Sequence, residues 1–86
     1  MMFEIQYDNQ SVKFLKKIDK NTAKRILDKI DELLAQNMVP SGAKRIIGEH
    51  GVFRIRVGDY RVLYRINYEE KKVIIFKIDK RSKVYD

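Results

Sequence analysis

Residues 52–66 read VFRIRVGDYRVLYRI, two runs of alternating side chains on either side of Gly58 and Asp59. Alternation is typical of strands, and a Gly-Asp pair between two such runs favours a hairpin with a two-residue turn. The turn predicts that Val57 pairs with Tyr60, and that Arg56 pairs with Arg61. Because side chains alternate across a sheet, one hairpin face is apolar: it carries Phe53, Ile55, Val57, Tyr60, Val62, Tyr64 and Ile66. The opposite, open face carries Arg54, Arg56, Arg61 and Arg65.

The arginine pair at the centre of this hairpin needs an explanation. Side chains at directly opposed positions have Cβ atoms ~5 Å apart, and like charges there destabilise a sheet by roughly a few tenths of a kcal/mol. Guanidinium groups that converge on one point suit a bound phosphate, since each donates two hydrogen bonds. The alternative is a solvated face on which the arginines splay apart and pair with Asp59 or Asp79. The pattern leaves both interpretations open.

The rest of the chain supplies elements to cover the apolar face. Phe3, Ile5 and Tyr7 alternate with polar residues and predict a short strand. Helical spacing predicts one helix that begins at Asp8 or Asn9, and a second that begins at Asp19 or Asn21 and ends near Asn37. Residues 38–51 are expected to be mostly loop, and the segment from there to Arg81 to be strands.

These elements predict a single α+β domain over residues 1–86. An N-terminal strand and a helical hairpin precede a three-stranded antiparallel meander, and the strands form one sheet. Val73 to Phe76 is apolar without alternation, as in a central strand, and the face that Lys77 occupies stays undecided. The predicted core contains Leu27, Ile30, Leu34, Ile55, Val62 and Tyr64.

Charge and composition restrict the function. Lys and Arg outnumber Asp and Glu by 19 to 12, which gives a net charge of +7 and favours a polyanionic partner, a nucleic acid or an acidic protein. The chain has no cysteine and one histidine, His50, so we expect no metal site and a reducing cytoplasmic location. The apolar runs are too short for a membrane span. A basic domain without a polyanionic partner is the alternative.

Two motifs carry a family resemblance. FRIRVGDYRVLYRI, residues 53–66, followed by a strand and then KRSKVY, residues 80–85, resembles the RelE/ParE superfamily of toxins, closest to its RelE branch. The resemblance implies a RelE-like, microbial-ribonuclease-like fold. It also implies a type II toxin that enters the ribosomal A site and cleaves mRNA without metal or cofactor. A cognate RelB-like antitoxin is the implied inhibitor.

The resemblance implies roles for individual residues. Arg54 and Arg56 match positions that hold the scissile phosphate and help to activate the 2′-hydroxyl, and Arg61 matches the arginine that stabilises the transition-state phosphate. Arg81 matches the arginine that assists the 5′-oxygen leaving group, and Tyr85 matches the tyrosine that stacks on or orients the nucleotide. Further RNA contacts are expected from basic residues nearby: Lys44, Arg45, Arg65, Lys80 and Lys83.

The chain also departs from the family pattern. Lys80 stands where many relatives have histidine, and Arg54 and Arg56 stand where some have lysine. The family's C-terminal helix is absent or reduced to a few residues. Arginine keeps its proton at ordinary pH and is a poor general base. Two other functions therefore stay open: a non-enzymatic ParE-like toxin that inhibits DNA gyrase, and a degenerate member that only binds antitoxin or nucleic acid.

Overall fold

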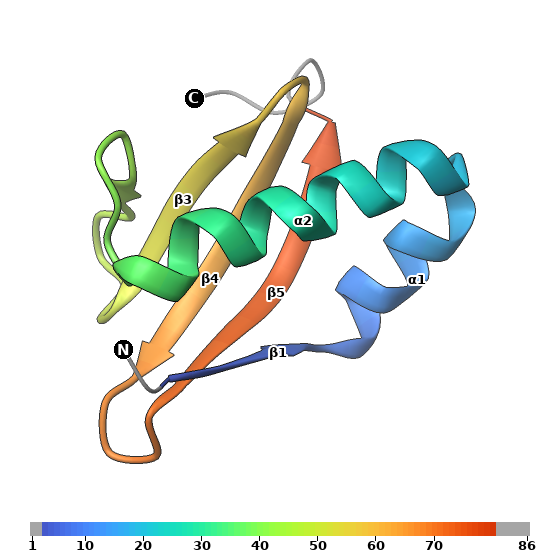
Figure 1. The fold of residues 1–86 in the computed structure, drawn as a ribbon. Helices are drawn as coiled ribbons and strands as arrows, with labels where there is room; N and C mark the ends of the chain where they lie inside the picture. The colour runs from blue at the N-terminus through green and yellow to red at the C-terminus, as the bar shows by residue number, and fades with distance from the viewer. Residues whose placement is uncertain (1–2, 81–86) are drawn as a thin grey trace.

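The structure, a computed structural model, describes residues 3–80. The elements are β1 (Glu4–Tyr7), α1 (Asn9–Lys17), α2 (Lys20–Gln36), β2 (Lys44–Arg45), β3 (Val52–Val57), β4 (Tyr60–Asn67) and β5 (Lys72–Lys80). The predicted α+β class is confirmed, with a strand, a helical hairpin and a meander in one sheet. Both helices lie on the same face of the sheet, where α2 crosses the long strands (Figure 1).

The sheet has five strands in the order β1-β5-β4-β3-β2. β1 pairs with β5 in parallel, while the other neighbours are antiparallel. β2 lies in the segment that the sequence assigns to a loop, and that assignment is wrong for Lys44 and Arg45. Two residues are too few to show an alternating pattern, so this strand is defined by its pairing with β3 alone.

The hairpin of β3 and β4 has the predicted register. Val57 pairs with Tyr60, Arg56 with Arg61, and the pairing continues to Val52 and Arg65. Gly58 has a φ of +58°, whereas Asp59 has a negative φ, which is the sign pattern of a type II′ turn. The Gly-Asp turn therefore sets which side chains share each face.

Aspartates begin both helices. The Asp8 carboxylate accepts a hydrogen bond from the Ser11 backbone N–H at 3.2 Å, and Asp19 accepts one from the Thr22 N–H at 3.0 Å. Each bond satisfies an N–H group that the helix itself cannot pair. The Ser11 hydroxyl is buried and donates to the Ile75 carbonyl at 3.1 Å, which ties α1 to β5.

The core lies between the helices and the sheet. Five of the six predicted core residues are buried, but the prediction for Leu27 is wrong: Leu27 is only partly buried and lies outside the core cluster. Ile26 takes its place because successive helical side chains are rotated by about 100°, so Ile26, Ile30 and Leu34 form the stripe that faces the sheet. The cluster is completed by Ile55, Val57, Val62, Tyr64, Ile66, Val73, Ile75 and Ile78.

Tyr64, which is buried, and Tyr7, which is partly buried, differ in how their hydroxyl groups are satisfied. The Tyr64 hydroxyl donates to the Met38 carbonyl at 2.6 Å, which holds the segment after α2 against the sheet. The Tyr7 hydroxyl is buried and has no hydrogen-bond partner among residues 3–80. Burial raises the pKa of both phenols, that of Tyr7 to about 12 with a smaller contribution from Asp31.

Neither helix in residues 3–80 has the length and apolar character that a bilayer span requires.

Candidate functional site

The four hairpin arginines lie on the sheet face opposite the helices. Alternation along β3 and β4 places Arg54, Arg56, Arg61 and Arg65 together, with Arg56 and Arg61 as direct cross-strand partners. Lys44 of β2 pairs with Arg54, and Lys77 of β5 pairs with Leu63, so the basic side chains extend to both neighbouring strands. We call this surface the arginine face; its basic residues are Lys44, Arg54, Arg56, Arg61, Arg65 and Lys77.

The arginine face is less open than the sequence predicts. Arg54 and Arg61 are each only 7% exposed, whereas Arg56 and Arg65 are exposed. The two buried arginines lie on interior strands, with a paired residue on either side: Arg54 between Lys44 and Leu63, and Arg61 between Arg56 and Asp79. The prediction that this face is open is therefore wrong for Arg54 and Arg61.

Arg61 has an acidic neighbour on β5. Its Nη2 lies 3.7 Å from Oδ2 of Asp79, and the two side chains are 9% and 15% exposed. The same carboxylate oxygen lies 3.7 Å from Nζ of Lys77 and is buried, with no hydrogen-bond partner in the described part of the chain. Of the two acidic partners that the sequence suggested, Asp59 and Asp79, the register brings Asp79 opposite Arg61.

Arg65 has a different environment on the same strand. Its Nη2 lies 3.8 Å from Oε1 of Glu49, and both side chains are about half exposed, at 48% and 55%. Its guanidinium carbon also lies 5.7 Å from the ring centroid of Phe76, a cation–π distance. β4 thus presents one buried and one exposed arginine–carboxylate pair on one face.

A hollow of about 280 Å³ opens beside β3. Lys44, Arg54 and Arg56 contribute its positive lining, and its other residues are Leu33, Ser41, Gly42 and Ile55. Converging lysine and arginine side chains suit an anionic ligand. The predicted proximity of Lys44 to the hairpin is confirmed by the pairing of Lys44 with Arg54.

The remaining candidate residues are placed differently. Arg45 pairs with Phe53, and Lys80 with Tyr60, so alternation assigns both to the helix-covered side of the sheet, where their side chains are exposed at its margins. Arg81, Lys83 and Tyr85 lie outside the described residues. The structure therefore brings together Lys44 and the four hairpin arginines.

Two members of the arginine face could not be assigned from the sequence. Lys77 reaches it because the pairing of β4 with β5 shifts between Leu63 and Tyr64, where a β-bulge interrupts the ladder. Alternation alone gives no sign of a bulge. Asp79 appears in the sequence only as a potential counterion, and its position opposite Arg61 follows from the same register.

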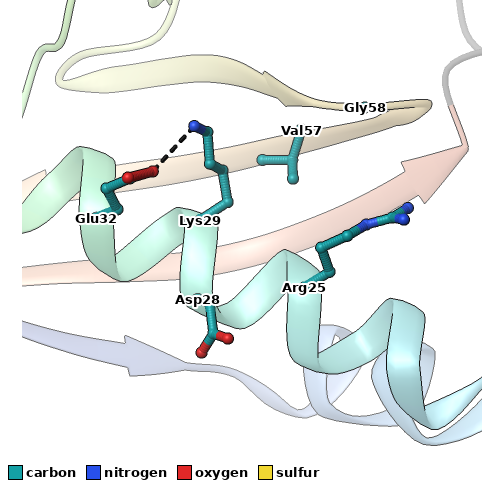
Figure 2. A pocket seen from close by; sticks show the side chains of 6 residues that line it. All are labelled: Arg25, Asp28, Lys29, Glu32, Val57 and Gly58. Atoms are coloured by element: carbon teal, nitrogen blue, oxygen red, sulfur yellow. Dashed lines mark ion pairs between the residues drawn. The ribbon is translucent and has the colours of Figure 1, made fainter.

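A second hollow, of about 380 Å³, lies on the helix side of the sheet. Figure 2 shows it between α2 and the hairpin turn, where Val57 and Gly58 face charged residues of the helix. Both signs of charge occur in it, and Lys29 pairs with Glu32 at 2.9 Å. His50 lies in the loop before β3, and within residues 3–80 no three His, Cys, Asp or Glu side chains are grouped as metal ligands.

The fold is similar to that of solved RelE toxins. The RelE–RelB complex of Pyrococcus horikoshii OT3 matches with a TM-score of 0.79 and 29% identity, over 98% of this chain and 100% of that chain. The RelB–RelE complex of Methanococcus jannaschii matches with a TM-score of 0.69 and 30% identity, over 94% and 95%. The RelBE2 toxin–antitoxin complex of Mycobacterium tuberculosis gives 0.79 and 25%, over 92% and 98%.

Sequence similarity leads to the same group. A Methanocaldococcus jannaschii protein named as a candidate toxin, RelE1, is 31% identical over 88 residues, which cover 99% of this chain and 97% of the relative. Residues 5–85 match the family model described as the ParE toxin of the type II toxin-antitoxin system, parDE. The chain belongs to this family of type II toxins, and the resemblance seen in its two motifs is confirmed.

Proposed function

We propose that this toxin is a ribosome-dependent endoribonuclease that cleaves mRNA in the A site and is inhibited by a cognate RelB-like antitoxin. One observation carries the proposal: Arg54, Arg56 and Arg61 lie on adjacent strands and share one face of the sheet. Two of these side chains are buried, because Arg54 and Arg61 are each only 7% exposed. Burial restricts a long side chain to few rotamers. Fixed guanidinium groups are what a phosphoryl transition state requires.

The proposed chemistry follows from the substrate. RNA carries its own nucleophile, so the protein has to align the 2′-hydroxyl with the phosphorus and stabilise the charge that develops. Arg54 and Arg56 hold the scissile phosphate, and Arg61 stabilises its transition state. The 2′-hydroxyl loses its proton as its oxygen bonds to phosphorus. The bond from phosphorus to the 5′-oxygen breaks and that oxygen takes up a proton, which gives a 2′,3′-cyclic phosphate and a 5′-hydroxyl end with no net gain or loss of protons. Arg81 and Tyr85, outside the described residues, are assigned to the leaving group and the nucleotide base.

Dependence on the ribosome accounts for the absence of an acid–base pair among the hairpin arginines. His50 is an exposed loop residue before β3 and is not a member of the arginine face. A toxin of this kind obtains substrate alignment from the ribosome, while the +7 charge favours docking on ribosomal RNA. Lys44, Arg45, Arg65, Lys80 and Lys83 are the proposed additional RNA contacts. A ribosomal target also implies action in the cytoplasm.

The antitoxin partner is proposed from the relatives. The similar crystal structures from P. horikoshii, M. jannaschii and M. tuberculosis are complexes of a RelE-type toxin with its antitoxin. The match with the P. horikoshii complex extends over 98% of this chain and 100% of that chain at 29% identity, which supports a partner of the same kind. A small acidic protein encoded beside this toxin is the expected inhibitor.

A second candidate function is gyrase inhibition, because the family model that matches residues 5–85 bears the ParE description. Two assays with the same protein separate the candidates. Programmed ribosomes are incubated with the toxin and the 5′ ends of the mRNA are mapped, and DNA gyrase supercoiling is measured in parallel. Cleavage at the A-site codon with unaffected supercoiling supports the nuclease. Inhibited supercoiling with intact mRNA would establish the gyrase inhibitor instead.

A further inference from the structure

We propose that Asp79 is a positioning residue for Arg61, which holds the guanidinium group where the reacting phosphate has to meet it. The catalytic part of this role rests on the proposed function. The structural part, restraint of Arg61 by the Asp79 carboxylate, does not depend on it.

The first step concerns the place of Asp79 in the sheet. Arg56, Arg61 and Asp79 form one cross-strand row over β3, β4 and β5, with Arg61 in the middle. Arg56 repels the Arg61 guanidinium from one side, and Asp79 attracts it from the other. This row therefore biases the Arg61 head group toward β5 and relieves the repulsion between the two arginines.

The second step concerns the cost of the carboxylate. The Asp79 side chain is 15% exposed, and its Oδ2 is buried without a hydrogen-bond partner, so the charge is largely removed from water. A carboxylate on this face also repels the phosphate that the arginines attract. Both effects oppose placing an aspartate here, and a neutral residue would avoid them. Orientation of a neighbouring catalytic group, together with relief of the repulsion between Arg56 and Arg61, is a benefit that accounts for its presence.

The third step compares the carboxylate partners of two arginines on β4, Arg61 and Arg65. Glu49 lies 3.8 Å from Arg65, almost the distance of Asp79 from Arg61, yet the Glu49 pair is about half exposed and the Asp79 pair is 9% and 15% exposed. Exposed pairs restrain their members weakly, because water and salt screen them. Glu49 is therefore a matched control: it carries the same charge beside the same face, without the burial.

The kinetic test compares Asp79→Asn with Glu49→Gln, since each removes one negative charge from the arginine face. The single-turnover cleavage rate at saturating toxin and the half-saturating toxin concentration are measured on programmed ribosomes. We expect Asp79→Asn to lower the saturating rate about tenfold or more, as expected for a displaced catalytic group, with half-saturation unchanged or lower. Glu49→Gln should keep the saturating rate. In an Arg61→Ala background, Asp79→Asn should have no further effect on the rate.

A second readout does not use cleavage. The Nε–Hε resonance of Arg61, assigned by its loss in Arg61→Ala, reports the order of this side chain through its heteronuclear NOE. Asp79→Asn should reduce that NOE, whereas Glu49→Gln should leave it unchanged. If Asp79→Asn fails to fold, Asp79→Glu takes its place, with a smaller change of the same sign because the carboxylate is displaced by one methylene.

Failure of the two proposals can be distinguished. A wild-type toxin that cleaves no mRNA would refute the proposed function, and the NOE of Arg61 would still test the restraint by Asp79. An unchanged heteronuclear NOE of the Arg61 Nε–Hε group in Asp79→Asn, or an equal loss of rate in Asp79→Asn and Glu49→Gln, would overturn the assignment of Asp79.

Discussion

Arg56 and Arg61 are direct cross-strand partners on the sheet face opposite the helices, and Arg61 is held between Arg56 and Asp79. Like charges at opposed positions oppose folding, while a carboxylate on the far side compensates. The Asp79 carboxylate therefore offsets the repulsion between the two arginines.

Replacement of Arg61 should affect both stability and activity. The sequence alone predicts a surface site with a stability change within ~0.5 kcal/mol. At 7% exposure Arg61 is buried, and its removal leaves the Asp79 carboxylate with Lys77 as its one remaining cation within ion-pair distance among the described residues. We expect Arg61→Ala to reduce the free energy of unfolding by about 1–3 kcal/mol. Urea unfolding measures this, and Arg65→Ala, an exposed site, should stay within ~0.5 kcal/mol of wild type.

Replacement by phenylalanine should change the free energy of unfolding in opposite directions at Tyr64 and Tyr7. Tyr64→Phe removes the 2.6 Å hydrogen bond to the Met38 carbonyl and should destabilise by about 1 kcal/mol. Tyr7→Phe removes a buried hydroxyl that has no partner and should stabilise by about 1 kcal/mol. Chemical denaturation of both variants checks the signs. A loss of stability in Tyr7→Phe as large as that in Tyr64→Phe would show that the Tyr7 hydroxyl is satisfied in solution.

Tyr7 also predicts a loss of stability in alkali. Burial raises its pKa from 10.0 in the unfolded chain to about 12 in the folded one, so the folded state retains a proton that the unfolded state releases. The contribution of Tyr7 is fully present below pH 10, and it decreases as the pH rises from 10 to 12. Unfolding midpoints between pH 9 and 12 should fall less steeply for Tyr7→Phe than for wild type; parallel curves would contradict the burial of this phenol.

The α2 stripe gives a packing prediction. Ile30 is fully buried at 0% exposure, and Ile30→Ala should cost about 2–5 kcal/mol. Leu27 lies three residues before Ile30 and outside the core cluster, so Leu27→Ala should reduce the free energy of unfolding clearly less. Thermal and urea unfolding compare the pair. An equal cost would mean that Leu27 belongs to the core in solution.

The salt dependence of binding should differ between the two proposed partners, the ribosome and the antitoxin. Ribosome binding through the arginine face releases counterions from RNA, so its affinity should fall steeply as salt rises. Binding of a RelB-like antitoxin should fall less, if it also buries apolar surface. Titrations of the wild type at several salt concentrations measure both slopes. Salt-insensitive ribosome binding would exclude the arginine face as the docking surface.

The hairpin was predictable because its information is local. Gly58 and Asp59 specify a two-residue turn, and the turn fixes each pair from Val52 and Arg65 to Val57 and Tyr60. The helix starts at Asp8 and Asp19 were predictable for the same reason, since a cap and its N–H partner are three residues apart.

Features that depend on distant pairing were not predictable. β2 exists only through its pairing with β3, and the face of Lys77 depends on a bulge that alternation does not reveal. The burial of Arg54 and Arg61 was not predictable either, because Arg56 and Arg65, the same residue type on the same two strands, are exposed. The apolar pattern of α2 includes both Ile26 and Leu27, so the sequence does not show which of the two faces the sheet. Packing against the sheet places Ile26 in the core cluster and leaves Leu27 outside it.

The central claim is that the arginine face cleaves RNA through individual arginines and not as a diffuse positive patch. Its most direct test is the rate of mRNA cleavage on programmed ribosomes for Arg61→Ala and Arg65→Ala, measured at saturating toxin and at a temperature where both variants are folded. We expect Arg61→Ala to lose about 10²-fold or more, as for one transition-state contact, and Arg65→Ala to stay within about a few-fold of wild type. An equal loss in both variants, or an unaffected Arg61→Ala, would contradict it.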